Sequence, residues 1–395
     1  MKEVNGINLE NIHTPAYLLD ERLLVKNLDL LKRVEDETGA KILLAQKGFS
    51  MFHVYPIISK YLAGTTASSF YEAKLGAEEF GGETHIFEPA YSDEDIDQIL
   101  EVADSIVFNS IAQLGKYKEK ALAAGCEVGL RVNPEYAEVE KDLYNPCIPG
   151  SRFGVTRAVL DAGLAANPDL LDGVSGIHFH CMCEQNSDTL DHVLDHVEEK
   201  FAEYFSMDSI KWINFGGGHH ITRPDYDIEL LEKCIKRMAD KYHAQIYLEP
   251  GEAVGLNTGF MITKITDIRE PVEVGDGLIV RPAILDASAA CHMPDVLEVP
   301  YKPEIIGAKE PGQAAYTYRF GGNTCLAGDI IGDYSWDHEL NIGDIIVMTD
   351  MAHYSMVKNN TFNGLRLPDI LSYNNTDGIK IVRSFGYEDF KNRLS

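Results

Sequence analysis

The sequence predicts an α/β protein that combines a TIM-like (β/α)8 barrel with a C-terminal all-β, barrel-like domain. Over the first two-thirds of the chain, apolar runs of strand length alternate with amphipathic segments of helix length. About eight such pairs fit into roughly 230 residues, which is the size and rhythm of a (β/α)8 barrel. After about residue 255, helical periodicity gives way to short strand-like runs separated by Gly, Pro and Asp.

The first helix and strand show how each pair is predicted. Residues 21–37 have apolar positions at helical spacing, with Asp20 placed as the N-cap and Gly39 placed to end the helix. The next run, residues 41–45, is apolar and has the length of a buried strand. Further strand candidates are residues 64–67, 84–87, 105–108, 127–132, 174–179, 211–215 and 245–248. Helical stretches between them include residues 93–102, 111–124, 187–205 and 228–242.

Residues 134–150 interrupt this alternation. They contain Pro134, Pro146 and Pro149 and have no clear apolar period. We expect a long loop at the mouth of the barrel, where the loops that follow the strands build the active sites of this fold.

The second predicted domain is rich in short strands. Its strand candidates are residues 259–265, 277–280, 316–320, 344–348 and 379–382. We place the barrel at residues 23–258, and the β domain at residues 1–22 together with 259–395.

Composition limits the class of protein. The chain has 395 residues, more than one ordinary domain, with 45% hydrophobic and 25% charged residues. No apolar run approaches the roughly 18 residues of a membrane span, and the N-terminal segment lacks the apolar core of a secretory signal. Seven Cys at irregular spacing do not indicate a disulfide framework. We expect a cytoplasmic protein.

The formal net charge of −27 argues against nucleic acid and anionic membranes as partners, because both require an excess of Lys and Arg. A negative field attracts small cations such as polyamines, although acidic surfaces also serve solubility.

Four short segments that follow strand candidates carry the predicted chemistry. Lys47 follows the first barrel strand, His180 the sixth, Gly216-Gly217-Gly218 the seventh and Glu249 the eighth. They supply an amine, a flat ring, backbone N–H groups that can approach a phosphate, and a carboxylate. Pyridoxal 5′-phosphate (PLP) requires this set, because it bonds to an amine, carries a phosphate and withdraws electrons best with a protonated ring nitrogen.

Each residue also has a structural interpretation on its own. A lysine or glutamate at a strand end can be an ordinary surface residue, and three glycines can be a flexible turn. His178 and His180 lie on one face of their strand, and an H-x-H pair is also typical of metal-dependent hydrolases. Further metal ligands are not evident at fitting positions, so we predict no metal. His219 and His220 receive no role.

With these segments in place, the chain resembles the fold-type III PLP decarboxylases, the family of ornithine and diaminopimelate decarboxylases and of alanine racemase. The resemblance covers nearly the whole chain. Residues 292–295, 321–329 and 351–364 most closely resemble the branch that decarboxylates carboxynorspermidine and carboxyspermidine.

The resemblance implies a role for each matching residue. Lys47 would be the Schiff-base lysine, His180 would stack on the pyridine ring and Glu249 would face its nitrogen. Gly216, Gly217 and Gly218, with Tyr354, would hold the phosphate. Cys325 would protonate the carbanion left after CO2 departs. Cys325 and Asp329 would come from the second subunit of a homodimer, and Asp286 and His292 would lie near the cationic end of the substrate.

The chain departs from the family pattern in the phosphate cup. Glu252 stands where many relatives have the arginine of Glu-Pro-Gly-Arg, and Cys181-Met182-Cys183 follows His180 where relatives commonly read His-x-Gly-Ser. Alanine racemase has a tyrosine at the position of Cys325, which argues against racemisation. We expect decarboxylation of carboxynorspermidine or carboxyspermidine. The alternatives are a decarboxylase of ornithine or diaminopimelate, a non-catalytic PLP-binding homologue and a metal hydrolase.

Overall fold

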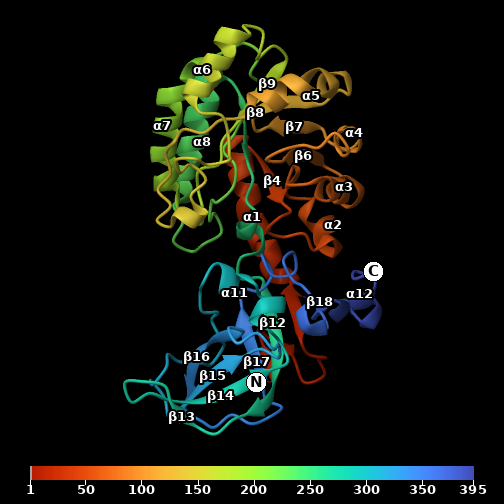
Figure 1. Ribbon diagram of the computed structural model, residues 1–395, viewed down its shortest axis with the longest axis vertical. Helices are drawn as coiled ribbons and strands as arrows, with labels where there is room; N and C mark the ends of the chain where they lie inside the picture. Colours follow the sequence, from red (N-terminus) through yellow and green to blue (C-terminus); the bar gives the residue numbers. More distant parts are fainter. Residues whose placement is uncertain (1) are drawn as a thin grey trace. The chain divides into compact units, whose positions relative to one another are not determined.

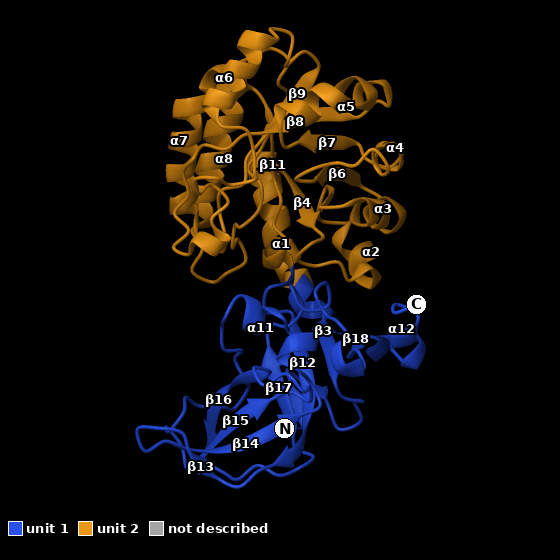
Figure 2. Ribbon diagram, in the orientation of Figure 1, with its two compact units in different colours: residues 1–24, 255–395 blue, residues 25–254 orange. Residues whose placement is uncertain are grey.

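The computed structural model describes residues 2–395, which form two compact units (Figure 2). One unit is residues 25–254. The other joins the segment that ends at residue 24 to the segment that begins at residue 255. The predicted combination of a parallel barrel with a separate sheet domain is confirmed.

The barrel unit (unit 2 in Figure 2) is a closed barrel of parallel strands in the order β10-β11-β4-β5-β6-β7-β8-β9, with helices around it (Figure 1). The strands are β4 Lys41–Ala45, β5 Gly64–Ala67, β6 Glu83–Phe87, β7 Ser105–Phe108, β8 Glu127–Arg131, β9 Val174–His178, β10 Trp212–Asn214 and β11 Gln245–Leu248. The helices are α1 Glu21–Thr38, η1 Phe52–Val54, α2 Tyr55–Ile58, α3 Phe70–Glu79, α4 Ile96–Leu100, α5 Ile111–Ala123, η2 Asp142–Tyr144, α6 Arg157–Ala166, α7 Ser187–Phe205, α8 Ile228–Tyr242 and α9 Glu252–Gly255.

The ends of α1 follow the predicted local chemistry. The Asp20 carboxylate accepts the backbone N–H of Arg22 at 3.0 Å, and Gly39 has a φ of +72° just beyond the last turn. The largest boundary error among the named helices is at α4, which begins at Ile96 rather than at residue 93. The loop after β8 contains a single 3-10 turn, η2, before α6 begins.

A large ring opposite two glycines fills the interior of the barrel. Trp212 on β10 is 2% exposed and clusters with Leu43, Val107 and Tyr247. A Cβ atom on Gly176 of β9 or on Gly129 of β8 would overlap the Trp212 indole. The two strands next in the ring therefore use glycine because the indole occupies their side-chain space.

The sheet unit (unit 1 in Figure 2) contains a branched sheet in the order β16-β15-β14-β12-β3-β18-β19, and β1 pairs with β2 in a separate two-stranded sheet. Its central strand β12 pairs with β3, β14 and β17, and β13 pairs with β14. The strands are β1 Glu3–Val4, β2 Ile7–Asn8, β3 Ala16–Asp20, β12 Gly259–Ile268, β13 Val272–Glu273, β14 Ile279–Leu285, β15 Tyr316–Gly321, β16 Ile330–Trp336, β17 Ile345–Thr349, β18 Asp369–Asn374 and β19 Gly378–Arg383. The short helices are α10 Ala289–His292, α11 Asp295–Glu298, η3 Phe362–Gly364 and α12 Tyr387–Lys391.

Strand β14 differs from its prediction. The sequence placed a strand at residues 277–280, whereas β14 continues to Leu285 through Pro282. Pro282 has no N–H to give, but its carbonyl accepts the N–H of Arg269 at 2.8 Å, so the strand tolerates it. Among residues 2–395, no helix has both the length and the apolar character needed to cross a membrane.

Candidate active site

The predicted barrel residues lie after four neighbouring strands. Lys47 follows β4, His180 follows β9, the three glycines follow β10 and Glu249 follows β11. These strands are consecutive in the ring, in the order β9-β10-β11-β4, and all are parallel. Their C-terminal ends therefore bring the four segments to one edge of the barrel.

Lys47 lies in the tight turn after β4, where the N–H of Gly48 donates to the Ala45 carbonyl at 3.1 Å. The lysine side chain retains accessible surface, yet burial lowers the pKa of its amine, and the nearby Arg131 charge lowers it further. The Glu249 carboxylate opposes this shift. An amine in this position is partly dehydrated by the surrounding protein but remains open to a ligand, which favours its neutral, nucleophilic form.

Glu249 is a buried carboxylate, 9% exposed, with one donor on each oxygen. Asn214 Nδ2 donates to Oε1 at 2.8 Å, and His178 Nε2 lies 3.2 Å from Oε2. Burial by itself raises the pKa of Glu249, but His178 and the Asn214 amide outweigh it and lower that pKa to about 2. Glu249 is therefore ionised at neutral pH.

His178 lies beside Glu249 within an aromatic stack. The His178 ring is stacked on the Phe87 ring at a centroid distance of 5.6 Å. The Arg131 guanidinium lies over two phenylalanine rings, 4.5 Å from the centroid of Phe87 and 4.6 Å from that of Phe153. Burial lowers the pKa of His178 despite the opposing Glu249 charge. A neutral His178 that donates from Nε2–H satisfies Oε2 of Glu249, which gives this histidine a structural partner in place of a metal.

His180 is also a neutral imidazole. Its Nδ1 accepts the N–H of Gly217 at 2.8 Å, which assigns the remaining ring proton to Nε2. Burial lowers the pKa of His180 well below its usual value, and the charges of Lys47 and Arg131 lower it further. Arg131 also donates to the His180 carbonyl at 3.3 Å. The ring is therefore uncharged and bonded at Nδ1, and Arg131 holds the backbone of the same residue.

The glycine loop packs against the ends of the adjacent strands. A Cβ on Gly216 would lie 2.6 Å from the Phe179 carbonyl oxygen, one on Gly217 would lie 2.5 Å from the Glu249 carbonyl oxygen, and one on Gly218 would overlap the Met182 carbonyl. Gly216 and Gly218 also have φ values of +70° and +86°. Packing and backbone conformation thus require glycine at all three positions.

Two of the three glycine N–H groups have acceptors within the protein. Gly216 N–H donates to Asn214 Oδ1 at 2.8 Å, and Gly217 N–H donates to His180 Nδ1. For Gly216 or Gly217 to donate to a phosphate, as the sequence predicts for this loop, its N–H would have to leave the acceptor it has here. Asn214 ends the strand that the loop follows, β10, whereas His180 follows the neighbouring strand β9.

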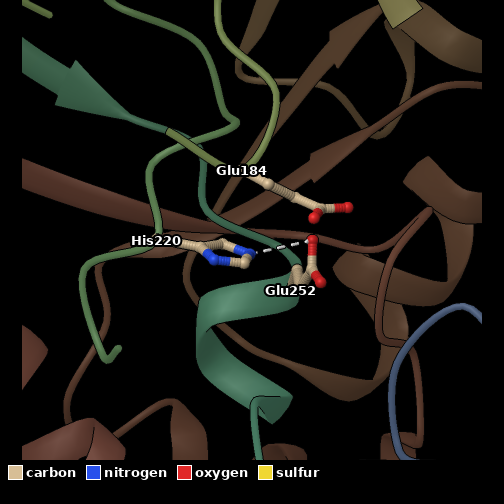
Figure 3. Close-up of side chains that lie close together, drawn as sticks. All are labelled: Glu184, His220 and Glu252. Carbon is tan, nitrogen blue, oxygen red and sulfur yellow. Dashed lines mark ion pairs between the residues drawn. The ribbon is translucent and has the colours of Figure 1, made fainter. Parts of the chain in front are cut away.

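His220, Glu184 and Glu252 lie close together, and His220 pairs with Glu252 (Figure 3). Their nearest ligand atoms all lie within 4.8 Å of one another, and His220 Nε2 is 3.2 Å from Glu252 Oε2. His220 is buried and Glu184 is exposed. Because the carboxylate of Glu252 already gives His220 a charged partner, the cluster does not require a metal ion.

The remaining predicted site residues lie in the sheet unit, where Asp329 joins two segments. Asp329 is 3% exposed, and its carboxylate accepts Ser288 Oγ at 2.8 Å, Thr324 Oγ1 at 2.7 Å and the Ala290 N–H at 3.1 Å. Cys325 is exposed, and its N–H donates to Asn363 Oδ1 at 2.7 Å. Residues 288–290, 324–329 and 363 are thus linked around Asp329 and Cys325.

Asp286, His292 and Tyr354 occupy other surroundings in the same unit. Asp286 accepts Thr14 Oγ1 at 2.5 Å and Thr263 Oγ1 at 2.6 Å. His292 is fully buried and accepts the Ser288 N–H at Nδ1, and burial lowers its pKa to about 4. Tyr354 is half-buried with a left-handed φ of 44°.

Sequence reasoning missed Arg131 and Asn214. Arg131 is the last residue of β8 and is 5% exposed, and Asn214 is the last residue of β10 and is 1% exposed. Their signal was the same as for Lys47, a polar residue at the end of an apolar barrel strand. Because neither arginine nor asparagine by itself suggests a direct role in PLP chemistry, the strand-end position alone did not mark them as site residues.

Comparison with known proteins decides the family. Residues 17–352 match the family described as pyridoxal-dependent decarboxylase, C-terminal sheet domain. The chain belongs to the pyridoxal-dependent decarboxylases. It is therefore a PLP-dependent decarboxylase, as the resemblance in the sequence predicted, and the alternative of a metal hydrolase is wrong.

Relatives within this family match over nearly their full lengths. A carboxynorspermidine/carboxyspermidine decarboxylase of Campylobacter jejuni is 41% identical, over 97% of this chain and 99% of that protein. A carboxyaminopropylagmatine decarboxylase of Synechocystis sp. is 40% identical, over 98% of this chain and 96% of that protein. The crystal structure of the C. jejuni carboxynorspermidine decarboxylase with norspermidine has a TM-score of 0.86 and 40% identity, covering 97% of this chain and 100% of that chain.

The barrel residues fit PLP. Glu249 is a buried ionised carboxylate whose two neighbours are neutral donors, so a protonated ring nitrogen would complete its surroundings. Lys47 offers an amine with a lowered pKa, and His180 offers an uncharged ring. This set provides an attachment point, a proton-holding acid and a stacking surface at one edge of the barrel.

Proposed function

We propose that this decarboxylase acts on carboxynorspermidine or carboxyspermidine and releases norspermidine or spermidine. The observation that supports this substrate class is the 41% identity to the C. jejuni decarboxylase over 97% of the chain. Two further features agree with a cationic substrate: the net charge of −27, and a glutamate, Glu252, at the fourth position of Glu-Pro-Gly-Glu.

Carboxyaminopropylagmatine is the second candidate substrate. The Synechocystis relative that is named for it is 40% identical over 98% of this chain, essentially the same level. The candidates share a carboxylated aminopropyl group and differ in the far end of the molecule, which is a guanidinium in the second candidate. Discrimination therefore depends on side chains that bind the distal cation.

Each barrel residue would have a separate role toward PLP. PLP supplies an aldehyde that condenses with amines and a ring that accepts the electron pair left when CO2 departs. Lys47 would hold the group through Nζ, and the Glu249 carboxylate would keep a proton on the pyridine nitrogen. His180 would present its uncharged face to the ring. The N–H groups of the glycine loop and the Tyr354 hydroxyl would donate to the phosphate.

Cys325 would return a proton to the substrate carbon from its thiol. Its exposed position on a segment held by Asp329 and Asn363 leaves Sγ accessible. The three hydrogen bonds accepted by Asp329 support a role in holding this segment. Asp286 and His292 would lie near the distal amine, and their engagement with Thr14, Thr263 and Ser288 favours an indirect influence on that amine.

The substrate is tested by CO2 release from five compounds in parallel: carboxynorspermidine, carboxyspermidine, carboxyaminopropylagmatine, ornithine and diaminopimelate. We expect kcat/KM for one of the first two to exceed that for the other three by at least tenfold. Lys47→Ala serves as the inactive control. Preference for carboxyaminopropylagmatine would establish the second candidate, and preference for ornithine or diaminopimelate would overturn both.

We also propose that the enzyme is a homodimer in which Cys325 serves the partner's barrel. Lys47→Ala and Cys325→Ala should each be inactive as pure proteins. Mixing them should restore about one quarter of wild-type activity, because half of the dimers are then mixed and each has one intact site. No recovery after verified subunit exchange would contradict shared sites.

A further inference from the structure

We propose that Asn214 and His178 are positioning residues that fix the orientation of Glu249, and that Asn214 couples this carboxylate to the glycine loop. The proposal rests on the proposed function, in which Glu249 faces the pyridine nitrogen. Neither residue is assigned a role by the family resemblance. Both lie at strand ends, Asn214 on β10 and His178 on β9.

The side chain of Asn214 donates one hydrogen bond and accepts another. Nδ2 donates to Glu249 Oε1 at 2.8 Å, and Oδ1 accepts the Gly216 N–H at 2.8 Å. These two bonds fix the amide orientation, because the flipped amide would place its NH2 against the Gly216 N–H and its oxygen against the carboxylate. Asparagine satisfies both neighbours, whereas aspartate would satisfy only Gly216.

His178 restrains the second oxygen of the carboxylate. Nε2 lies 3.2 Å from Glu249 Oε2, and the ring, 1% exposed, is stacked on Phe87. A carboxylate that accepts one donor on each oxygen cannot rotate about its last bond without losing one of them. The plane of the Glu249 carboxylate is therefore set by two side chains from adjacent strands.

The glycine loop is tied to the same carboxylate. The Glu249 N–H donates to the Gly216 carbonyl at 2.8 Å, while the Gly216 N–H donates to Asn214. Gly216 is thus linked to Glu249 by its backbone and through Asn214. In the proposed function, Gly216 belongs to the loop that binds the phosphate, and Glu249 faces the ring nitrogen at the other end of the cofactor site. Asn214 is the side chain that touches both.

The decisive variant is Asn214→Asp. It keeps an oxygen for the Gly216 N–H but removes the donor to Glu249 and places two carboxyl groups side by side, which then share a proton. Because Glu249 has a pKa of about 2 in the wild type, it does not titrate near neutrality. We expect the variant to show a transition in the visible spectrum of the holoenzyme between about pH 6 and 8 that the wild type lacks. We also expect weaker PLP binding and a kcat at least tenfold lower.

Asn109→Asp is the matched control. Asn109 follows β7, is 8% exposed and also uses both ends of its amide, donating to the Pro89 and Arg152 carbonyls and accepting the Gly154 N–H. It makes no hydrogen bond to Glu249. The control should lose stability but show no added spectral transition, so a general effect of a buried aspartate is distinguished from an effect on Glu249.

His178 gives an independent test that does not add charge. His178→Gln can still donate an N–H toward Oε2, whereas His178→Phe keeps a stacking ring without a donor. We expect His178→Phe to bind PLP less tightly than wild type by at least fivefold, and His178→Gln to regain most of that loss. Equal affinities for the two variants would contradict the positioning role of His178, and this readout remains if Asn214→Asp does not fold.

Glu249→Gln separates failure of this proposal from failure of the proposed function. If it leaves the spectrum and kcat unchanged, Glu249 does not face the ring and the proposed function is wrong at this residue. If Glu249→Gln changes both but Asn214→Asp matches the wild type, the proposed function stands and Asn214 serves packing alone.

Discussion

His219 should add to the acid sensitivity of the barrel, alongside His178 and His180, whose pKa values burial also lowers. His219 follows Gly218 directly and is 1% exposed. Burial lowers the pKa of His219 to about 4, against the opposing effect of the nearby Phe215 backbone and the Glu249 carboxylate. The folded barrel therefore holds a neutral imidazole that the unfolded chain would protonate near pH 6.5.

The sign and size of the effect follow from linkage. The folded-state pKa lies below the unfolded value, so the stability from this group is fully present above about pH 6.5 and is lost as the pH falls toward 4. Between pH 7 and pH 5 the unfolded chain gains most of a proton that the folded barrel does not bind. This difference removes about 2 kcal/mol of unfolding free energy.

The chain has two tryptophans, one in each unit, so replacing one of them lets the other report on a single unit. In a Trp336→Phe background, the fluorescence of Trp212 reports unfolding of the barrel. The unfolding free energy in urea is measured at pH 7 and pH 5, without added PLP, for the protein with His219 and for the His219→Gln variant. The glutamine cannot titrate. We expect the loss of unfolding free energy between the two pH values to be about 2 kcal/mol smaller in His219→Gln.

An exposed histidine, His243, provides the control. His243→Asn changes an exposed histidine in the left-handed position after α8, a conformation that asparagine accepts. It should leave the pH dependence of the wild type unchanged. If His219→Gln and the wild type lose the same free energy between pH 7 and pH 5, the buried neutral state of His219 does not contribute and the reasoning is wrong.

Three further predictions concern packing, the Cys325 segment and the lysine. Gly176→Ala should cost roughly 1–3 kcal/mol of barrel stability because its methyl overlaps the indole, and Trp212→Phe in the same chain should recover part of it in urea unfolding. Ser288→Ala removes the donor to Asp329 and should cost about 1–2 kcal/mol, measured by Trp336 fluorescence. Lys47→Arg should remain folded by circular dichroism but show no PLP adduct after borohydride reduction; an adduct would refute the assignment of Lys47.

The barrel could be predicted from the sequence because its strands are buried on both sides. Strands β4, β5, β7 and β11 match the predicted ranges, since short apolar runs bounded by polar residues have few other interpretations. The sheet unit was harder. Strand β19 is exposed along most of its length, and β14 includes Pro282, so neither shows a buried alternating pattern. The strand candidates named from the sequence include none at β3, β16 or β18.

The position of the site could be predicted, but its internal contacts could not. A polar residue after an apolar barrel strand must lie at the C-terminal edge, so Lys47 and Glu249 could be placed without knowing their neighbours. Asn214 and His178 are 35 and 71 residues from Glu249, and they meet it only when the barrel closes. No local pattern records that closure, which is why the acid was predicted without its donors.

The three glycines allow close packing against neighbouring carbonyls and also place backbone N–H groups at the site. Their missing side chains are required by the Phe179, Met182 and Glu249 carbonyls, whether or not a ligand is present. Yet the N–H of Gly217 donates to His180, the ring expected to stack on the cofactor. In the proposed function, Gly217 would give up His180 Nδ1 as the acceptor of its N–H in order to donate to the phosphate, and the imidazole would then be free to turn. Phosphate binding and ring stacking would then be coupled through one backbone N–H group, and the arginine that many relatives use near the phosphate would not be needed for that coupling.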